Sequence, residues 1–255
     1  MRGIVLFPII NCSGAMVEIT STEMTPPVND SHEFIPMRGI RNRHLQTMLP
    51  RLIRRKVKFN AHWQRLELPD GGNMLACLLA KEGRDIPIEA AVIVSAPFVL
   101  EACSYHMDKG FSRVYQRYLL NLLKANASRK LSAYPGSLPV NLAQLKSMRR
   151  IREFDDLITA KIHGFADAID YYRQCSAMPL LNQIAKPTLI IHAKDDPFMD
   201  HHVIPKAEDL PPQVEYQLTE HGGHVGFIGG TPLRPEMWLE RRIPDWLTTY
   251  LEASS

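Results

Sequence analysis

Two stretches of the sequence combine a short apolar run with residues that can transfer a proton. The first run, 187–193, leads into Lys194 and then into Asp195 and Asp196. The second, 214–218, is followed by a glycine-rich segment that contains His224. A carboxylate at the carboxyl end of a buried strand lies where α/β sheets place their active sites. Glycines on both sides of a histidine let the backbone turn sharply and leave the imidazole projecting. The spacing therefore indicates an acid and a histidine on the loops after successive strands.

An acid followed by a histidine, each behind a strand, is the late half of the chain order Ser, Asp, His in α/β-hydrolases. In that chemistry the histidine removes the serine proton, and the acid orients the ring and stabilises its charged form. Both Asp195 and Asp196 fit the acid. We favour Asp196, because the acid commonly stands three residues after the small residue that ends the strand, here Ala193. Asp195 is then its neighbour or a cap, and His221 is expected to pack or to form hydrogen bonds.

A sheet of buried parallel strands is needed to position these two loops. Continuous apolar runs of strand length are typical of strands covered on both faces. The sequence has three such runs, at 90–96, 187–193 and 214–218. The fold class we expect is therefore α/β.

Helical patterns accompany the three runs. The segment 73–81 is small and apolar and is closed by Gly83, so it is expected to lie buried against the sheet. The segment 237–251 reads as a closing amphipathic helix that is interrupted near Pro244.

A long helical insertion separates the first apolar run from the second. Apolar side chains fall at helical spacing between Phe111 and Leu123, and a second helix is expected over 157–173. The pattern fits ordinary helix packing, and it also fits a cap over an apolar substrate pocket. Both can hold, because a lid packs with one stripe and lines the pocket with another.

Composition excludes several classes of function. The chain has 255 residues, of which 45% are hydrophobic, enough for the core of one or two domains. A net charge of +3, without a phosphate loop or a nucleic-acid motif, does not indicate a nucleic-acid partner. Four scattered cysteines without a C-x-x-C pair indicate neither a zinc site nor a disulfide framework. The cysteine usage suits a cytoplasmic location.

The N-terminus allows more than one interpretation. A charged start and a short apolar run resemble a weak signal peptide, and Cys12 invites a lipid anchor, although the residue before it is bulky for such a site. We favour a non-native upstream start, with initiation near Met16 or Met24 and a disordered lead-in over 20–31. No run approaches the roughly 20 apolar residues of a membrane span.

The next segments lead towards the first helix. An ordered piece is expected over 34–50, followed by the basic run 51–58, which is a solvated face or a contact with an anionic surface such as lipid headgroups. A strand is expected over 57–68 and a turn over 69–71.

Several motifs resemble those of the bacterial YheT-like hydrolases, relatives of the animal α/β-hydrolase-domain esterases and lipases. They are R-N-R-H-L-Q-T at 41–47, F-D-D at 154–156, Y-Y-R-Q-C-S at 171–176, A-K-D-D-P-F at 193–198 and G-G-H-V-G-F at 222–227. The resemblance implies a Ser/Asp/His carboxylic-ester hydrolase with a helical cap and with neither a metal nor an organic cofactor. It also implies a small-molecule ester or lipid-like substrate, with peripheral membrane contact possible.

The resemblance is interrupted at 70–73. Members of the family continue from the turn at 66–71 through several strands and helices before they reach G-x-S-x-G-G-N, but here the turn joins directly to Gly72 and Asn73. If 71–73 is the end of that motif, Pro69 stands at the nucleophile's position and no acyl-enzyme can form there. The loop that supplies an oxyanion donor is missing as well, so we expect little or no turnover. The run 90–96 would then keep an unpaired edge unless 57–68 moves beside it.

Serine and cysteine side chains elsewhere in the sequence are candidates for a substitute nucleophile. Ser95 follows a strand but lacks the flanking glycines of a nucleophile elbow, so we expect its hydroxyl to be satisfied by backbone. Ser104 and Ser176 lie in the insertion, and Cys77 and Cys103 lack a thiol-enzyme signature.

The sequence thus predicts an α/β-hydrolase fold with an incomplete central parallel sheet. A disordered or non-native extension covers 1–33, and a truncated hydrolase domain covers 34–255, with a helical cap at about 103–180. The chain is expected to be a strongly impaired esterase or, alternatively, a non-catalytic ligand- or partner-binding remnant.

Overall fold

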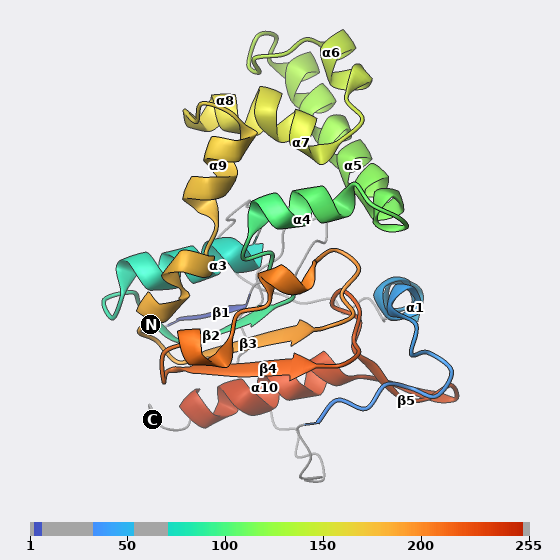
Figure 1. Ribbon diagram of the computed structural model, residues 1–255, viewed down its shortest axis with the longest axis vertical. Helices are drawn as coiled ribbons and strands as arrows, with labels where there is room; N and C mark the ends of the chain where they lie inside the picture. Colours follow the sequence, from blue (N-terminus) through green and yellow to red (C-terminus); the bar gives the residue numbers. More distant parts are fainter. Residues whose placement is uncertain (1–2, 7–32, 54–70, 252–255) are drawn as a thin grey trace. The chain divides into compact units, whose positions relative to one another are not determined.

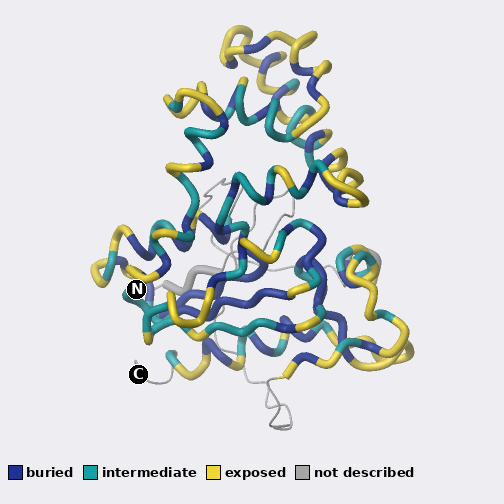
Figure 2. The backbone as a smooth tube through the Cα atoms, viewed as in Figure 1, coloured by how far each residue is buried: buried dark blue, intermediate teal, exposed yellow. Residues whose placement is uncertain are grey.

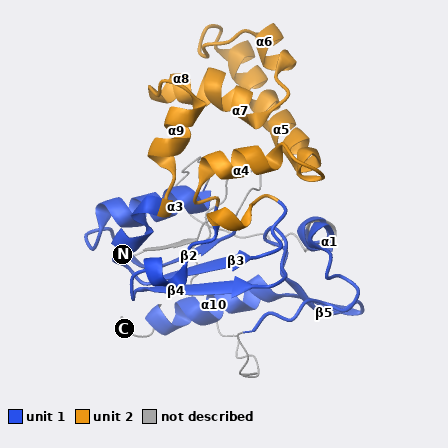
Figure 3. Ribbon diagram, in the orientation of Figure 1, with its two compact units in different colours: residues 1–96, 179–197, 204–255 blue, residues 97–178, 198–203 orange. Residues whose placement is uncertain are grey.

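The computed structural model describes residues 3–6, 33–53 and 71–251 (Figure 1). The chain divides into two compact units, which Figure 3 shows in different colours. The first unit comprises 1–96, 179–197 and 204–255, and the second comprises 97–178 and 198–203. The turn predicted at Pro69 and most of the basic run lie outside the described residues, as does the strand predicted over 57–68.

The first unit is built on a four-stranded sheet. All neighbouring strands are parallel, and their order across the sheet is β1, β2, β3, β4. The strands are β1 (Gly3–Leu6), β2 (Ile88–Val94), β3 (Thr188–Ala193) and β4 (Val214–Thr219). Every residue of β3 is buried, as expected for a strand covered on both faces. The three strands predicted from apolar runs are confirmed to within two residues at each end.

The edge of β2 is paired, contrary to the expectation that it would be left open. β1 lies parallel to it, with Val5 opposite Ala91 and Leu6 opposite Val92. The backbone groups of this short segment satisfy those along the edge of β2, which would otherwise be exposed. The extension over 1–33 is predicted from the sequence to be disordered or non-native. The pairing of Gly3–Leu6 does not fit disorder there, a non-native start stays a prediction, and 7–32 lies outside the described residues.

Helices cover the sheet on opposite faces. Val92 and Val94 of β2 belong to the same buried cluster as Trp246 and Leu247 of α10 (Trp238–Leu251). Ile93 points to the other face, because side chains alternate along a strand. There it packs beside Gly72 at the start of α3 (Gly71–Glu82), the helix predicted over 73–81. β2 and β3 appear as the buried strands of this sheet in Figure 2.

The predicted interruption of the closing helix is wrong, because α10 continues through Pro244. Leu239 before the proline and Trp246 and Leu247 after it are all buried in the cluster against the sheet. The indole Nε1 of Trp246 also donates a hydrogen bond to Glu215 of β4 at 2.7 Å. These contacts hold both halves of the helix to the sheet, which compensates for the backbone hydrogen bond that proline cannot donate.

The remaining elements of the first unit are short. They are α1 (Arg43–Met48), α2 (Pro50–Ile53), the 3-10 turn η4 (Ala207–Asp209) and the antiparallel pair β5 (Ile228–Thr231) and β6 (Arg234–Met237). The 3-10 helix η2 (Met178–Gln183) begins at the last residue of the second unit's long segment and continues into the first unit.

The second unit is helical and has a core of its own. Its elements are α4 (Leu100–Met107), α5 (Ser112–Ala133), α6 (Leu142–Ser147), α7 (Ile151–Phe154), the π-helical η1 (Asp155–Thr159), α8 (Ala160–His163), α9 (Ala168–Cys175) and the 3-10 turn η3 (His201–Val203). Leu120, Leu145 and Phe154 are among the residues buried together in that core. Its extent, 97–178, is close to the insertion predicted at about 103–180, but the role of a cap stays a prediction.

The single helix predicted over 157–173 is wrong. Gly164 adopts a left-handed conformation with φ of 81° and ends α8, a role that glycine fills without strain. Asp167 then caps α9, because its side chain accepts a hydrogen bond from the backbone amide of Asp170 at 2.8 Å. A glycine C-cap and an aspartate N-cap thus divide an otherwise helical pattern.

No helix in the described part of the chain has the length and apolarity that a membrane crossing requires.

Candidate active site

The acid loop follows directly from the end of β3. The backbone amide of Lys194 donates to the carbonyl of Thr219 at 2.8 Å, which extends the pairing with β4 by one residue. The amide of Asp196 then donates back to the carbonyl of Ala193 at 3.2 Å and closes a tight turn. This turn directs the side chain of Asp196, only 2% exposed, towards the loop that follows β4.

Asp196 and His224 form a buried pair. Nδ1 of His224 lies 2.8 Å from Oδ2 of Asp196, and the histidine is only 6% exposed. A carboxylate only accepts, so Nδ1 carries the proton in this contact. In the neutral ring the unprotonated nitrogen is then Nε2, on the opposite side of the imidazole. The structure therefore brings together the acid and the base favoured on sequence grounds, in the tautomer that lets Nε2 accept a proton.

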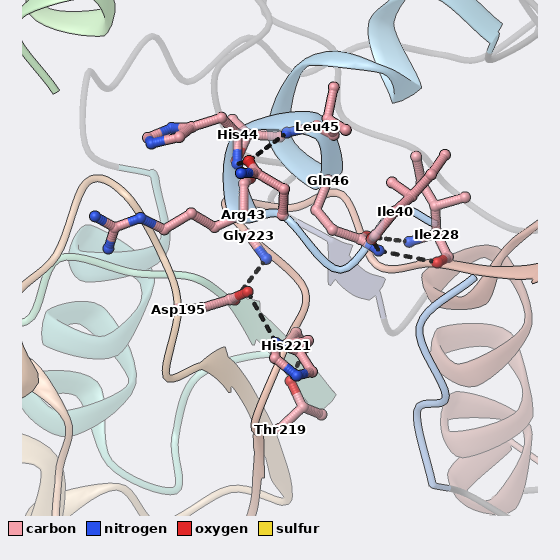
Figure 4. A network of polar contacts seen from close by, with 12 residues as sticks. Ile40, Arg43, His44, Leu45, Gln46, Asp195, Thr219, His221, Gly223 and Ile228 are labelled. Carbon is pink, nitrogen blue, oxygen red and sulfur yellow. Dashed lines mark hydrogen bonds and ion pairs between the residues drawn. The ribbon is translucent and has the colours of Figure 1, made fainter. Parts of the chain in front are cut away.

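Asp195 has a different role in the same loop (Figure 4). Its carboxylate accepts a hydrogen bond from the backbone amide of Gly223 at 2.9 Å and lies 3.3 Å from Nδ1 of His221. The hydroxyl of Thr219 donates to the carbonyl of His221 at 2.6 Å. Burial raises the pKa of Asp195, and the hydrogen bond from Gly223 partly opposes that effect. Asp195 and His221 thus brace the loop that carries His224.

The helix α1 contains the N-R-H-L-Q-T motif and supports the same loop. Asn42 caps the helix, since its side chain accepts from the amide of His44 at 2.9 Å. Gln46 is fully buried, and its amide nitrogen donates to the carbonyls of Ile40 and Ile228 at 2.6 and 3.1 Å. Its side-chain oxygen accepts from the amide of Ile228 at 2.7 Å (Figure 4). Gln46 therefore joins the segment before α1 to the start of β5 through three backbone groups.

Thr47 supports the histidine directly. Its hydroxyl accepts a hydrogen bond from the backbone amide of His224 at 2.9 Å and donates to the carbonyl of Arg43 at 2.8 Å. The motif is visible in the sequence, but this contact is not predicted from it. Only the side-chain chemistry of Gln46 and Thr47, one amide and one hydroxyl on the same short helix, hinted at it.

Two glycines permit this close approach of helix and loop. A Cβ on Gly223, whose φ is +59°, would lie 2.6 Å from the carbonyl oxygen of Arg43 and from the hydroxyl of Thr47. A Cβ on Gly226 would lie 1.7 Å from the carbonyl oxygen of Gln46. The glycine-rich sequence around His224 therefore reflects a backbone packed against α1.

His192 is a structural neighbour of the pair. It is buried in β3, with Nε2 donating to the carbonyl of Ala96 at 3.1 Å and Nδ1 positioned to accept from the hydroxyl of Tyr216 at 3.4 Å. Burial lowers the pKa of His192 to about 4, so the ring is neutral at ordinary pH. Burial also raises the pKa of Tyr216. A neutral His192 connects the carboxyl end of β2 with β4 below the acid loop.

The expected environment of Ser95 is wrong. Its backbone amide donates to Ile191 at 2.8 Å, but its hydroxyl is buried and has no hydrogen-bond partner among the described residues. Its φ is +49°, which is strained for a residue other than glycine.

Of the other candidate nucleophiles, Cys77 lies in α3 of the first unit, and the rest have local contacts in the second unit. The hydroxyl of Ser176 accepts from the amide of Leu100 at 3.0 Å and donates to the carbonyl of Tyr172 at 2.6 Å. Tyr172 donates to Ser104 at 3.3 Å. Cys103 is packed in an apolar cluster. None of these side chains gains an activating base from these contacts.

Elsewhere in the second unit, Asp200, His201 and His202 form a group that could hold a metal ion.

Comparison with known proteins places the chain in a family. A family model described as "alpha/beta hydrolase fold" matches residues 71–231. The chain is 58% identical to "Putative esterase YheT" of Escherichia coli (strain K12) over 340 residues, an alignment that covers 94% of this chain and 100% of that protein. It is 31% identical over 189 residues to "Putative esterase slr0264" of Synechocystis and 28% identical over 184 residues to human "Phospholipase ABHD3".

The two more distant matches cover 71% of this chain, but only 50% and 44% of those relatives' own length. The alignment with the E. coli protein spans that protein from end to end. The sheet, the matched family model and this relative agree, and the chain belongs to the α/β-hydrolase fold family, among the YheT-like hydrolases.

Proposed function

We propose that this chain derives from a serine-type carboxylic-ester hydrolase, keeps its acid and its base, and has lost its nucleophile. The observation that carries the proposal is the buried 2.8 Å contact between Asp196 and His224, each on the loop after one of two neighbouring parallel strands. The substrate class we propose is a small-molecule ester or a lipid-like ester. A cytoplasmic location belongs to the same proposal and rests on the cysteine usage.

The retained pair of Asp196 and His224 suits the proton transfers of ester hydrolysis. Asp196 holds the Nδ1 proton, so Nε2 of His224 is the nitrogen that would take a proton from a serine hydroxyl. The carboxylate would also stabilise the imidazolium that forms. The protonated Nε2 would then give its proton to the leaving alcohol. Both functions need a hydroxyl beside Nε2, and an oxyanion site beside the attacked carbonyl.

Two observations support the loss of the nucleophile. The 255-residue sequence contains no G-x-S-x-G motif. The alignment with the E. coli relative is 340 residues long, whereas 94% of 255 residues is about 240, so about 100 alignment positions carry no residue of this chain. Both observations fit an internal deletion that removes the nucleophile elbow and the oxyanion loop.

The start of α3 supports the position of that deletion. A Cβ on Gly72 would lie 2.8 Å from Cβ of Ala96, so only glycine allows the helix to approach the end of β2 this closely. Close packing of this kind suits a glycine that ends a nucleophile elbow and begins the following helix. This supports the interpretation of 71–73 as the end of the motif, which places Pro69 at the nucleophile's position.

Ester turnover by this chain should therefore be very low. Loss of triad members leaves measurable catalysis only while the oxyanion hole and substrate binding remain. The test is reaction with a fluorophosphonate probe, together with hydrolysis of short p-nitrophenyl esters and with the E. coli relative as positive control. We expect no labelling of this chain. Labelling that is lost in His224→Ala would contradict the proposal, because it would reveal a working nucleophile.

A gain-of-function experiment complements this test. The segment of the E. coli relative that has no counterpart here can be inserted between Asp70 and Gly71, and we call this variant the restored chain. Because the acid–base pair is already in place, the restored chain should react with the probe. The insertion site is the point at which the resemblance to the family is interrupted.

A non-catalytic role is the alternative proposal. The observation in its favour is that each compact unit has a buried apolar core, so each can stay folded without catalytic activity. It requires a cooperative thermal melt and a defined oligomeric state. Aggregated or rapidly proteolysed protein would exclude it.

A further inference from the structure

Residues 198–203 form a segment of the second unit that lies against α4 (Figure 3). Met199 and Val203 are buried in one apolar cluster with Cys103 of α4. Phe198 packs on Tyr115 of α5 with ring centroids 4.8 Å apart. Apolar contacts therefore anchor the segment on both sides of its polar centre, which consists of Asp200, His201 and His202.

The polar centre brings a carboxylate and imidazoles together. Nδ1 of His201 and Nδ1 of His202 each lie 2.7 Å from Oδ1 of Asp200, and their ring centroids are 3.9 Å apart. The second carboxylate oxygen, Oδ2, lies 3.8 Å from Nδ1 of His106 on α4. One ligand atom from each of Asp200, His201 and His202 can be chosen so that all lie within 4.8 Å of one another.

These ligand types are selective for a class of ion. Imidazole nitrogen suits zinc, copper, iron and nickel, whereas calcium and magnesium take oxygen ligands. Zinc binds imidazole nitrogen at about 2.0–2.1 Å, so two ligands of one ion lie about 4 Å apart or less. The ligand atoms of Asp200, His201 and His202, which lie within 4.8 Å of one another, are close to that limit. The side chains of His201 and His202 are 77% and 71% exposed, so an ion can reach them from solvent and small side-chain rotations can complete the site.

We propose that Asp200, His201 and His202 bind a divalent ion of the zinc class, with His106 as the residue that positions Asp200. Two imidazoles and one carboxylate supply three ligands, and water can complete the coordination. Nδ1 of His106 lies 3.8 Å from the carboxylate oxygen that faces α4, so a small side-chain rotation would bring it within hydrogen-bond distance and let it orient Asp200. A bound ion would fix the segment that follows Asp196 and Pro197 in the chain onto α4. The proposal uses only the second unit and does not depend on ester hydrolysis.

Zinc titration of the full chain by calorimetry, after treatment with a chelator, tests the site. We expect one saturable site, and tetrahedral absorption bands when Co²⁺ replaces zinc. The double substitution His201→Ala with His202→Ala should weaken zinc binding about 100-fold or more, and His106→Gln about tenfold, in the range typical of residues that orient a ligand. His163→Ala removes an exposed histidine of the same unit outside the cluster, so it is the matched control and should change the affinity less than about twofold.

Thermal melts provide a second measurement. Zinc should raise the melting temperature of the unsubstituted chain and of His163→Ala, but not of the double variant, because an ion that binds only the folded state stabilises it. Melts without zinc show whether each variant folds like the unsubstituted chain. Absence of saturable binding would overturn the proposal, and so would zinc affinity that survives the double substitution in a folded variant.

Discussion

The backbone amide of His224 donates a hydrogen bond to the hydroxyl of Thr47 at 2.9 Å, although 177 residues separate the two in the chain. The same α1 helix inserts Gln46 between the backbone groups of Ile40 and Ile228. The N-R-H-L-Q-T motif is therefore a support for the histidine loop. It holds His224 from one side while Asp195 braces the loop from the other.

Substitution of Thr47 tests this support. Thr47→Val keeps the shape of the side chain but leaves the amide of His224 without its acceptor, so we expect a loss of about 1–3 kcal/mol in the free energy of unfolding. The measurement is urea denaturation followed by fluorescence. Thr248→Val removes an exposed hydroxyl from α10 and serves as control, with an expected change within about 0.5 kcal/mol. Equal effects of the two substitutions would argue against a supporting role for Thr47.

The junction before α3 makes a prediction with a definite sign. Inside a helix, alanine normally stabilises relative to glycine by up to about 1 kcal/mol. At Gly72 the added Cβ would meet Ala96 at 2.8 Å and Ile93 at 3.3 Å, so Gly72→Ala should instead destabilise the chain by about 1–3 kcal/mol. Lys81→Ala at the exposed end of the same helix should be close to neutral. A stabilising Gly72→Ala would show that α3 does not pack closely on β2.

His192 predicts a dependence of stability on pH. Burial lowers its pKa from 6.5 to about 4 in the folded chain. Between these values the unfolded chain binds the proton and the folded chain does not, so stability falls as pH falls through this window. The full effect is about 3 kcal/mol, since each pKa unit corresponds to about 1.4 kcal/mol. His192→Gln cannot titrate, so its urea midpoint should change less between pH 7 and pH 4.5. If His192→Gln lost as much stability between pH 7 and pH 4.5 as the unsubstituted chain, groups other than His192 would cause the pH dependence.

The two adjacent aspartates should differ sharply in the restored chain. Asp196→Asn replaces a carboxylate, which only accepts hydrogen bonds, with an amide that can also donate, so the tautomer of His224 is no longer fixed. The equivalent change in a serine protease lowers kcat by about 10⁴-fold. We expect a loss of about a thousandfold or more in ester hydrolysis. Asp195→Asn keeps an oxygen for the amide of Gly223 and should lose less than about tenfold. Measuring kcat on one short ester separates the two, and a reversed order would assign the acid to Asp195.

Local pattern was sufficient to predict the elements that position the site. The strands β2, β3 and β4 are continuous apolar runs because both faces of the sheet are covered. The choice of Asp196 rested on its spacing from Ala193. The structure gives the physical reason for that spacing, a turn in which the amide of Asp196 donates to the carbonyl of Ala193.

The features that the sequence did not predict depend on contacts between distant segments or on local details that compete with a pattern. The pairing of β1 with β2 joins residues more than 80 positions apart, and its short apolar run is equally typical of a leader segment. The contact between Thr47 and His224 has no local signature. The helical pattern continues through Gly164, yet the helix ends there because the glycine caps it. Pro244 predicts an interruption, yet α10 continues because both of its halves are buried against the sheet.

Fluorophosphonate labelling of this chain and of the restored chain, side by side, tests the central claim most directly. We claim that the acid and base are intact and that only the nucleophile and its oxyanion loop are missing. We expect no labelling of the chain itself, and labelling of the restored chain that disappears in His224→Ala. Labelling of the unrestored chain would contradict the account. So would a folded restored chain that does not react with the probe, because it would show that the pair of Asp196 and His224 cannot activate a serine.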